Sequence, residues 1–269
     1  MPADRYRAGL AGVAAFVALS GSQALAQAAV PVPVAKETET IVHAGHLIDG
    51  VSRNVRDKVS IVIRDRRIVA VQPGFVTGSP GATTIDLSSE TVLPGLIDAH
   101  VHLTEANGGG NRIAKSVTMT PLDIALHAVP EARRELEAGF TSVRNLMAPA
   151  GADIALKKAI DDGTIAGPRM WVSGMALSAT GGHADPAGGL IPELARADMT
   201  GAFEREAVVD GPDSVRRAVR LQHMRGANVI KLMASGGVIS LGDDPNAQLM
   251  DDDEIAAAVH SAHELGDRK

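Results

Sequence analysis

Two histidines stand two residues apart at the end of the segment 93–102, Leu-Pro-Gly-Leu-Ile-Asp-Ala-His-Val-His. Alternate side chains of a β-strand point to the same face, so His100 and His102 can both reach one metal ion. Their neutral nitrogens suit Zn and similar divalent ions. The spacing by itself is not specific, but here the pair follows a Pro94-Gly95 turn and ends a predicted strand. The segment therefore predicts a metal site at the carboxyl end of that strand.

Lys231 is the one charged residue in the apolar run 229–234, Val-Ile-Lys-Leu-Met-Ala. Burying an ammonium group costs several kcal/mol unless the group is paired, deprotonated or chemically modified. Two interpretations stay open. Lys231 lies at a strand end and reaches solvent or a carboxylate, or its amine carries a carbamate formed with carbon dioxide, which would be an anionic bridge between two metal ions.

Two further residues are candidates for contact with a substrate. His183 follows Gly181-Gly182, which predicts a flexible loop near the ends of the strands; an ordinary loop histidine is the alternative. Arg144 ends a predicted strand and could anchor a carboxylate or form a structural ion pair. Asp98, two residues before His100, could orient the strand or support a metal ligand.

The elements that would position these residues alternate between strand and helix. The predicted strands are 96–103, 141–146, 169–173 and 228–233, and the predicted helices are 121–137, 152–161, 214–224 and 251–265. Repeated βα units predict an α/β fold with a parallel sheet and right-handed crossovers. Four such units are visible in residues 93–269, whereas a closed barrel of this kind needs eight.

The last predicted helix has clear end signals. Asp251 and Glu254 fit a capping box, and Gly266 fits the stop. We expect one apolar stripe on this helix, formed by Ile255, Ala258, Val259, Ala262 and Leu265. His260 and His263 have a spacing that could bind a metal, but the outer helices of a barrel lie far from its mouth.

The residues before the βα units have a different character. Short β-rich runs separated by turns occupy residues 40–92 and predict a small antiparallel sheet. Residues 27–39 are rich in Pro, Val and Ala and are typical of a linker. In residues 1–26, two arginines precede a short apolar stretch and an Ala-Leu-Ala site, which predicts a secretory signal peptide. We therefore expect a secreted protein, periplasmic in a Gram-negative bacterium, with no membrane attachment after cleavage.

The composition of the chain excludes or disfavours several classes of function. The formal net charge of −6 disfavours binding to nucleic acid or to an anionic membrane. Aromatic residues make up 2% of the chain, too few for stacking platforms that bind single-stranded nucleic acid. The chain has no cysteine, which excludes disulfides, thiolate metal sites and a cysteine nucleophile.

Taken together, these segments resemble the amidohydrolase superfamily, in the branch with imidazolonepropionase-like enzymes and Xaa-Pro dipeptidases. The resemblance runs from about residue 40 to the end of the chain. It covers the entry strands 41–50, the segment that ends in His100 and His102, and the segments 139–144 (Gly-Phe-Thr-Ser-Val-Arg), 180–185 (Thr-Gly-Gly-His-Ala-Asp) and 226–237 around Lys231.

The resemblance implies the N-terminal half of a (β/α)8 TIM-type barrel in residues 93–269, preceded by part of a small β-sandwich in residues 40–92. It implies one or two metal ions, most simply Zn, with a metal-activated water as the nucleophile that hydrolyses amide C–N bonds. His100 and His102 carry over as ligands of the more buried ion, and Lys231 as the carboxylated bridging lysine. The proton-shuttle Asp and two further histidines of the family pattern would lie beyond Lys269.

The expected substrates are dipeptides or N-acyl amino acids. Cyclic amides, as in imidazolonepropionase-like enzymes, and aryl amides or toxin-like amides are the alternatives. A third alternative is a catalytically incomplete chain that lacks the later ligands, binds one metal weakly or assembles as a homo-oligomer.

Overall fold

The computed structural model describes residues 38–105, 118–188, 191, 202–238 and 244–266. The chain forms two compact units. The first contains the residues up to Leu47 together with Arg56–Thr91, and the second contains Ile48–Val55 and the residues from Val92 onward. The predicted signal peptide, residues 1–26, lies outside the described residues, as does all but the end of the predicted linker, residues 27–39. None of the helices in the described segments combines the length and the apolarity needed to cross a membrane.

The first unit is a four-stranded sheet in the order β3-β2-β1-β4. Its strands are β1 (Glu39–Leu47), β2 (Arg56–Arg64), β3 (Arg67–Pro73) and β4 (Thr83–Val92). β2 pairs antiparallel with β1 and β3, and Asp65 and Arg66 have the positive φ angles that a tight two-residue hairpin turn favours. β4 is longer than the sequence predicts. Most of its residues are polar, so the sequence shows little of the alternation of polar and apolar residues by which a strand is predicted.

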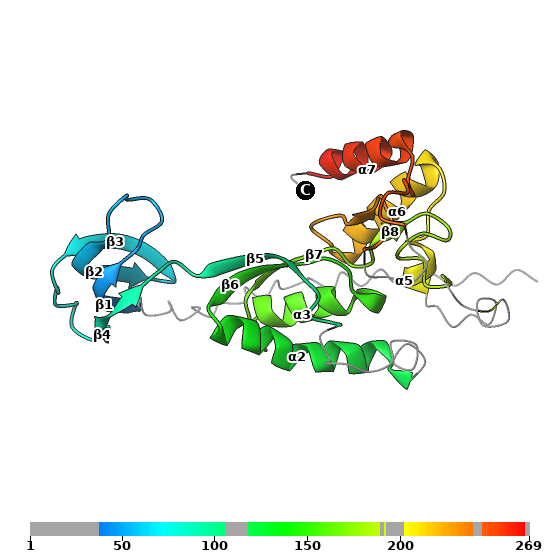
Figure 1. Ribbon diagram of the computed structural model, residues 1–269. Helices are drawn as coiled ribbons and strands as arrows, with labels where there is room; N and C mark the ends of the chain where they lie inside the picture. The colour runs from blue at the N-terminus through cyan, green and yellow to red at the C-terminus, as the bar shows by residue number, and fades with distance from the viewer. Residues whose placement is uncertain (1–37, 106–117, 189–190, 192–201, 239–243, 267–269) are drawn as a thin grey trace, which may run out of the picture. The chain divides into compact units, whose positions relative to one another are not determined.

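A three-stranded parallel sheet begins the second unit. Its strands, in spatial order, are β5 (Leu96–Val101), β6 (Phe140–Asn145) and β7 (Arg169–Val172). Helices α2 (Pro121–Glu137) and α3 (Ala152–Asp161) lie on one face of this sheet (Figure 1), and a short 3-10 helix, η1 (Pro149–Gly151), leads into α3. Both helices have the predicted bounds. Their buried residues, such as Ala132 and Leu156, pack with Val143 of β6 in one apolar core.

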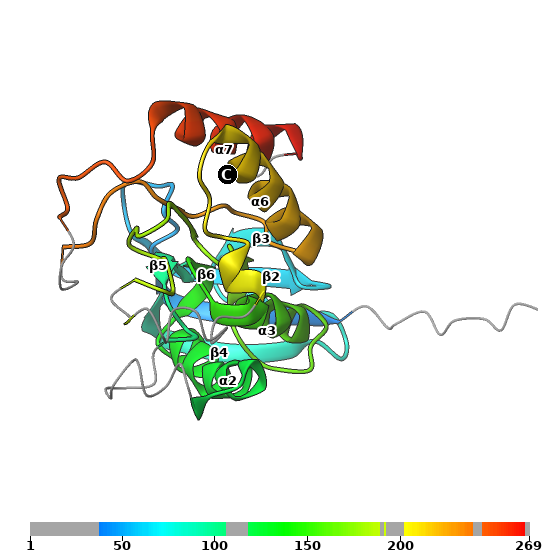
Figure 2. The ribbon, with the colours of Figure 1, turned by 90° about the vertical axis from the view of Figure 1, so that its right-hand side faces the viewer.

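The chain then forms a second parallel pair, β8 (Leu177–Ser178) and β9 (Leu232–Met233). Helix α5 (Ala202–Arg205) follows β8, and helices α6 (Pro212–Arg225) and α7 (Asp252–Glu264) lie side by side in both views (Figures 1 and 2). The predicted strand 228–233 is shorter in the structure: Asn228 and Val229 bond to Val172 of β7, whereas the β8–β9 ladder holds only Leu232 and Met233 of this segment. The backbone N–H of Val172 donates to Asn228 Oδ1 at 2.7 Å, and the N–H of Asn228 donates to the carbonyl of Val172 at 2.9 Å.

Helix α7 begins with the predicted capping box of Asp251 and Glu254, and Gly266 follows its end with a positive φ. The predicted apolar stripe is wrong at one position. Val259 is 46% exposed, whereas Ala258 and Ala262 are buried against the core formed with α6. The buried face is centred on Ala258 and includes Glu254 and Ser261, so Val259 lies beyond its edge.

Candidate functional site

The two histidines of the predicted metal site stand where β5 ends. His100 is in the strand and His102 follows its last residue. The centroids of the two imidazole rings lie 5.2 Å apart, with 51° between the ring planes. The carboxylate of Asp98 accepts a hydrogen bond from the backbone N–H of His100 at 2.9 Å, so Asp98 does orient the strand end. The structure brings the two imidazoles together, and their role as metal ligands stays a prediction.

The surroundings of His100 favour its neutral form. Partial burial lowers the pKa of His100 most, followed by the positive charges of Lys231, His102 and Arg144, while Asp98 acts in the opposite direction. Lys231 and Arg144 thus count among the charges that act on His100. A neutral imidazole is the form that binds a metal ion.

Lys231 stands directly before β9, and its backbone carbonyl accepts a hydrogen bond from the N–H of Leu177 at 2.9 Å. The residue is partly buried, and both interpretations of Lys231 stay open. The β8–β9 ladder begins only at Leu232, which leaves Lys231 outside it. Its positive charge acts on His100, which is the ground for a metal-bridging role that stays a prediction.

The donor atoms at this site fit a divalent metal ion. Nδ1 of His102 is buried, and no described residue is a hydrogen-bond partner for it. Buried polar atoms are almost always satisfied, and an imidazole nitrogen can be satisfied by a metal ion. In the part of the chain that the structure describes, the histidine site included, no three His, Asp or Glu side chains gather to hold a metal ion. The site thus offers two imidazoles.

His183 lies on a loop that is tied down rather than loose. Thr180 Oγ1 donates to Asp210 Oδ2 at 2.6 Å, and the N–H of Gly181 donates to Asp185 Oδ2 at 2.7 Å. The imidazole of His183 rests against Gly237, where an added Cβ would lie 2.1 Å from Cε1 of the ring. The loop therefore holds His183 over the segment that follows β9.

Arg144 links β6 to the strand that carries the histidines. Its Nε donates to the carbonyl of Ala99 at 2.7 Å, between Asp98 and His100 in sequence. This contact is neither the ion pair nor the substrate contact that the sequence predicts for Arg144. It places the guanidinium beside the histidine site.

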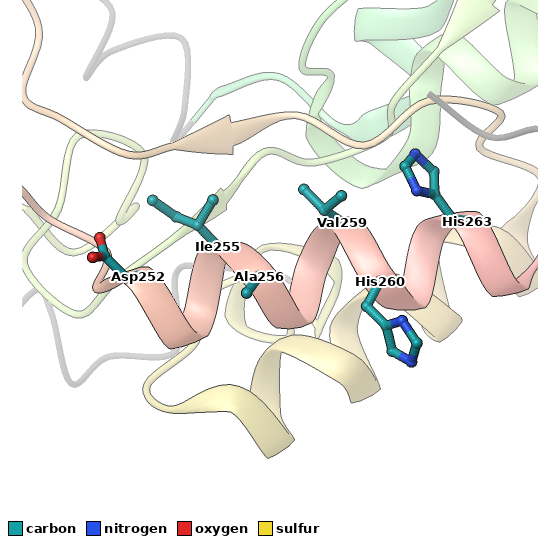
Figure 3. Close-up of a pocket in the computed structure, with 6 residues that line it drawn as sticks. All are labelled: Asp252, Ile255, Ala256, Val259, His260 and His263. Carbon is teal, nitrogen blue, oxygen red and sulfur yellow. The ribbon is translucent and has the colours of Figure 1, made fainter.

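His260 and His263 do not converge on a common point. In Figure 3, His263 extends from the side of α7 that carries Ile255 and Val259, whereas His260 extends from the other side. His260 Nε2 lies 3.2 Å from Glu264 Oε1 on the same helix. The two histidines line a shallow depression on the surface of α7, which is no metal site.

Comparison with known proteins assigns the chain to a family. Residues 91–268, most of the chain, match the amidohydrolase family. The chain belongs to the amidohydrolase family. This amidohydrolase is 36% identical to ochratoxinase from Aspergillus niger over 235 residues, which are 83% of this chain and 48% of ochratoxinase. It thus spans about half the length of the curated relatives it matches.

Solved structures of similar proteins agree with an α/β fold for this amidohydrolase. A Xaa-Pro dipeptidase with bound methionine superposes with a TM-score of 0.75 at 34% identity, over 85% of this chain and 55% of that chain. A prolidase complexed with N-methylphosphonate-L-proline gives 0.70 at 36% identity, over 84% of this chain and 54% of that chain. The crystal structure of Aspergillus niger ochratoxinase gives 0.70 at 32% identity, over 85% of this chain and 54% of that chain.

Sequence reasoning missed two buried residues of this amidohydrolase beside the histidine site. Asn145, the last residue of β6, accepts a hydrogen bond from the N–H of Leu103 at 2.8 Å through Oδ1. Its Nδ2 donates to the carbonyl of Met147 at 3.1 Å and to Asp153 Oδ2 at 3.4 Å. Burial raises the pKa of Asp153 to about 6, against the hydrogen bonds that it accepts. The available signal was an Asn at the end of a predicted strand and an Asp in the first turn of the next helix.

Proposed function

We propose that this chain carries the first part of the active site of a metal-dependent hydrolase that cleaves amide C–N bonds. The observation that carries the proposal is the meeting of His100 and His102 at the end of β5, where their ring centroids lie 5.2 Å apart. Membership of the amidohydrolase family supports it. The parallel strands β5, β6 and β7 with α2 and α3 on one face suit the N-terminal half of a (β/α)8 barrel.

The residues would divide the work as follows. His100 and His102 hold the metal ion, and Lys231 completes the set, either as an amine or as a carbamate. A divalent ion bound there supplies Lewis-acid chemistry and lowers the pKa of a water molecule. His183 and Arg144 would orient the substrate, Arg144 being the group suited to a carboxylate.

The favoured substrates are dipeptides or N-acyl amino acids. Support comes from the Xaa-Pro dipeptidase and the prolidase among the similar structures. The second candidate is an aryl or toxin-like amide, and the 36% identity to ochratoxinase favours it. Both classes share an amide carbonyl for the metal site, so the leaving group and the acyl group distinguish them.

The test is zinc content and hydrolysis, measured on the purified 269-residue chain. Zinc is quantified by elemental mass spectrometry, and hydrolysis is measured with a Xaa-Pro dipeptide, an N-acyl amino acid and an aryl amide. We expect zinc-dependent hydrolysis that His100→Asn abolishes and that His127→Asn, on the exposed side of α2, leaves unchanged. Zinc binding without hydrolysis of any of the three substrates would mean a catalytically incomplete chain. Equal zinc binding by His100→Asn would refute the ligand assignment.

A further inference from the structure

One pair of buried side chains ties together the carboxyl ends of three parallel strands. Asn145 and Asp153 are both fully buried. Asn145 Oδ1 accepts from the N–H of Leu103, just after β5, and its Nδ2 donates to the carbonyl of Met147, just after β6. Asp153 Oδ2 accepts from Asn145 Nδ2 at 3.4 Å and from the N–H of Gly174, just after β7, at 3.1 Å. The Asn145–Asp153 pair thus contacts each place where the chain leaves the sheet.

The hydrogen bonds of the Asn145–Asp153 pair begin where the hydrogen bonds between the strands of the sheet end. The last ladder partners between β5 and β6 are Val101 and Asn145, and the register shifts between Asp98 and Val101. Beyond Val101, the N–H of Leu103 has Asn145 Oδ1 as its partner at 2.8 Å. A buried polar network with its bonds satisfied is rigid, because breaking any one bond leaves a buried group unpaired.

The loop after β6 also carries backbone strain. Met147 has a φ of 106° and Ala150 a φ of 50°, and neither is a glycine. Both backbone polar groups of Met147 form hydrogen bonds. Its N–H donates to Ser173 Oγ at 2.8 Å, and its carbonyl accepts from Asn145 Nδ2. Strain of this kind persists where surrounding contacts over-determine the backbone, and it clusters at functional sites.

The bond to Leu103 acts on the residue before it. The N–H of Leu103 belongs to the same peptide unit as the carbonyl of His102, so holding that unit restrains the backbone of His102 and the direction of its Cα–Cβ bond. We propose that the Asn145–Asp153 pair is a positioning device that aims the imidazole of His102 at the site it shares with His100. The inference rests on the proposed function for its purpose, but its structural content concerns His102 alone.

The test follows the imidazole of His102 in the full chain by NMR, with 13C-labelled histidine. The chain has nine histidines, and the His102 signal is assigned with the variant His102→Asn. Asn145→Leu removes the acceptor for Leu103 at similar volume, and Asn145→Ser removes it with a small polar side chain if the leucine variant does not fold. Val143→Ala is the matched control, because it truncates a buried residue of the same strand and breaks none of these bonds.

Without metal, we expect either Asn145 variant to shift or broaden the His102 signal while the signal of His183 stays in place. Val143→Ala should leave both signals in place. With zinc, measured against a chromophoric chelator, the Asn145 variant should bind about 10–100-fold more weakly than the wild type, as for other residues that support metal ligands. An unmoved His102 signal, or equal movement in Val143→Ala, would overturn the inference. If wild-type signals do not respond to zinc, the proposed metal site fails, and the metal-free comparison still decides the role of Asn145.

Discussion

The buried carboxyl group of Asp153 should make the stability of the protein depend on pH in an unusual direction. Burial raises the pKa of Asp153 from 3.8 to about 6. The folded state therefore holds this proton more tightly than the unfolded chain, so the free energy of unfolding falls as the pH rises from 3.8 to about 6 and stays low above that range. At about 1.4 kcal/mol per pKa unit, the ionised group costs roughly 3 kcal/mol of stability at neutral pH.

Replacing the ionisable group isolates this contribution. Urea unfolding of the wild type and of Asp153→Asn at pH 4 and pH 7 gives the difference in free energy of unfolding at each pH. We expect that difference to change by about 2.4 kcal/mol in favour of Asp153→Asn between pH 4 and pH 7, because the amide cannot ionise.

Asp162, at the end of the same helix, supplies a control of opposite sign. Hydrogen bonds from Thr164 lower the pKa of Asp162, so its contribution to stability is present above its usual pKa and is lost as the pH falls. Asp162→Asn should therefore lose stability relative to the wild type as the pH rises. A difference between the wild type and Asp153→Asn that stays constant from pH 4 to pH 7 would show that burial does not govern the proton of Asp153.

Two further predictions concern the site itself. A Cβ at position 237 would lie 2.1 Å from the ring of His183, so Gly237→Ala should displace that ring, cost about 1–3 kcal/mol of stability and raise the KM for a dipeptide. Steady-state kinetics test this against Ser235→Ala on the same segment, and an unchanged KM would mean that His183 does not contact the substrate. Lys231→Ala should abolish zinc-dependent hydrolysis, and a short carboxylic acid that replaces a carbamate should restore part of it. Full activity of Lys231→Ala without added acid would exclude a bridging role.

Much of the helical structure could be predicted because its signals are local. The bounds of α2 and α3 agree with the sequence pattern, and the capping box of Asp251 and Glu254 starts α7 as predicted. Caps, helix periodicity and turn residues act between neighbours a few positions apart, so the chain displays them before it folds. The same holds for His100 and His102, whose closeness follows from strand geometry alone.

Predictions failed where a residue's surroundings come from distant parts of the chain. Val259 fits an apolar stripe, yet it is 46% exposed, because packing against α6 determines which face of α7 is buried. The predicted strand 228–233 is reduced to Leu232 and Met233, which pair with β8, while Asn228 bonds to Val172 of β7.

The sequence by itself determined the α/β character of the chain, its helices, the paired histidines and the family. Only the tertiary structure decided how these parts support one another. It placed the ring of His183 against Gly237, and it buried Asn145 and Asp153 where three strands end. The physical reason is that local signals depend on residues adjacent in sequence, whereas burial and long-range hydrogen bonds exist only once segments distant in sequence are in contact.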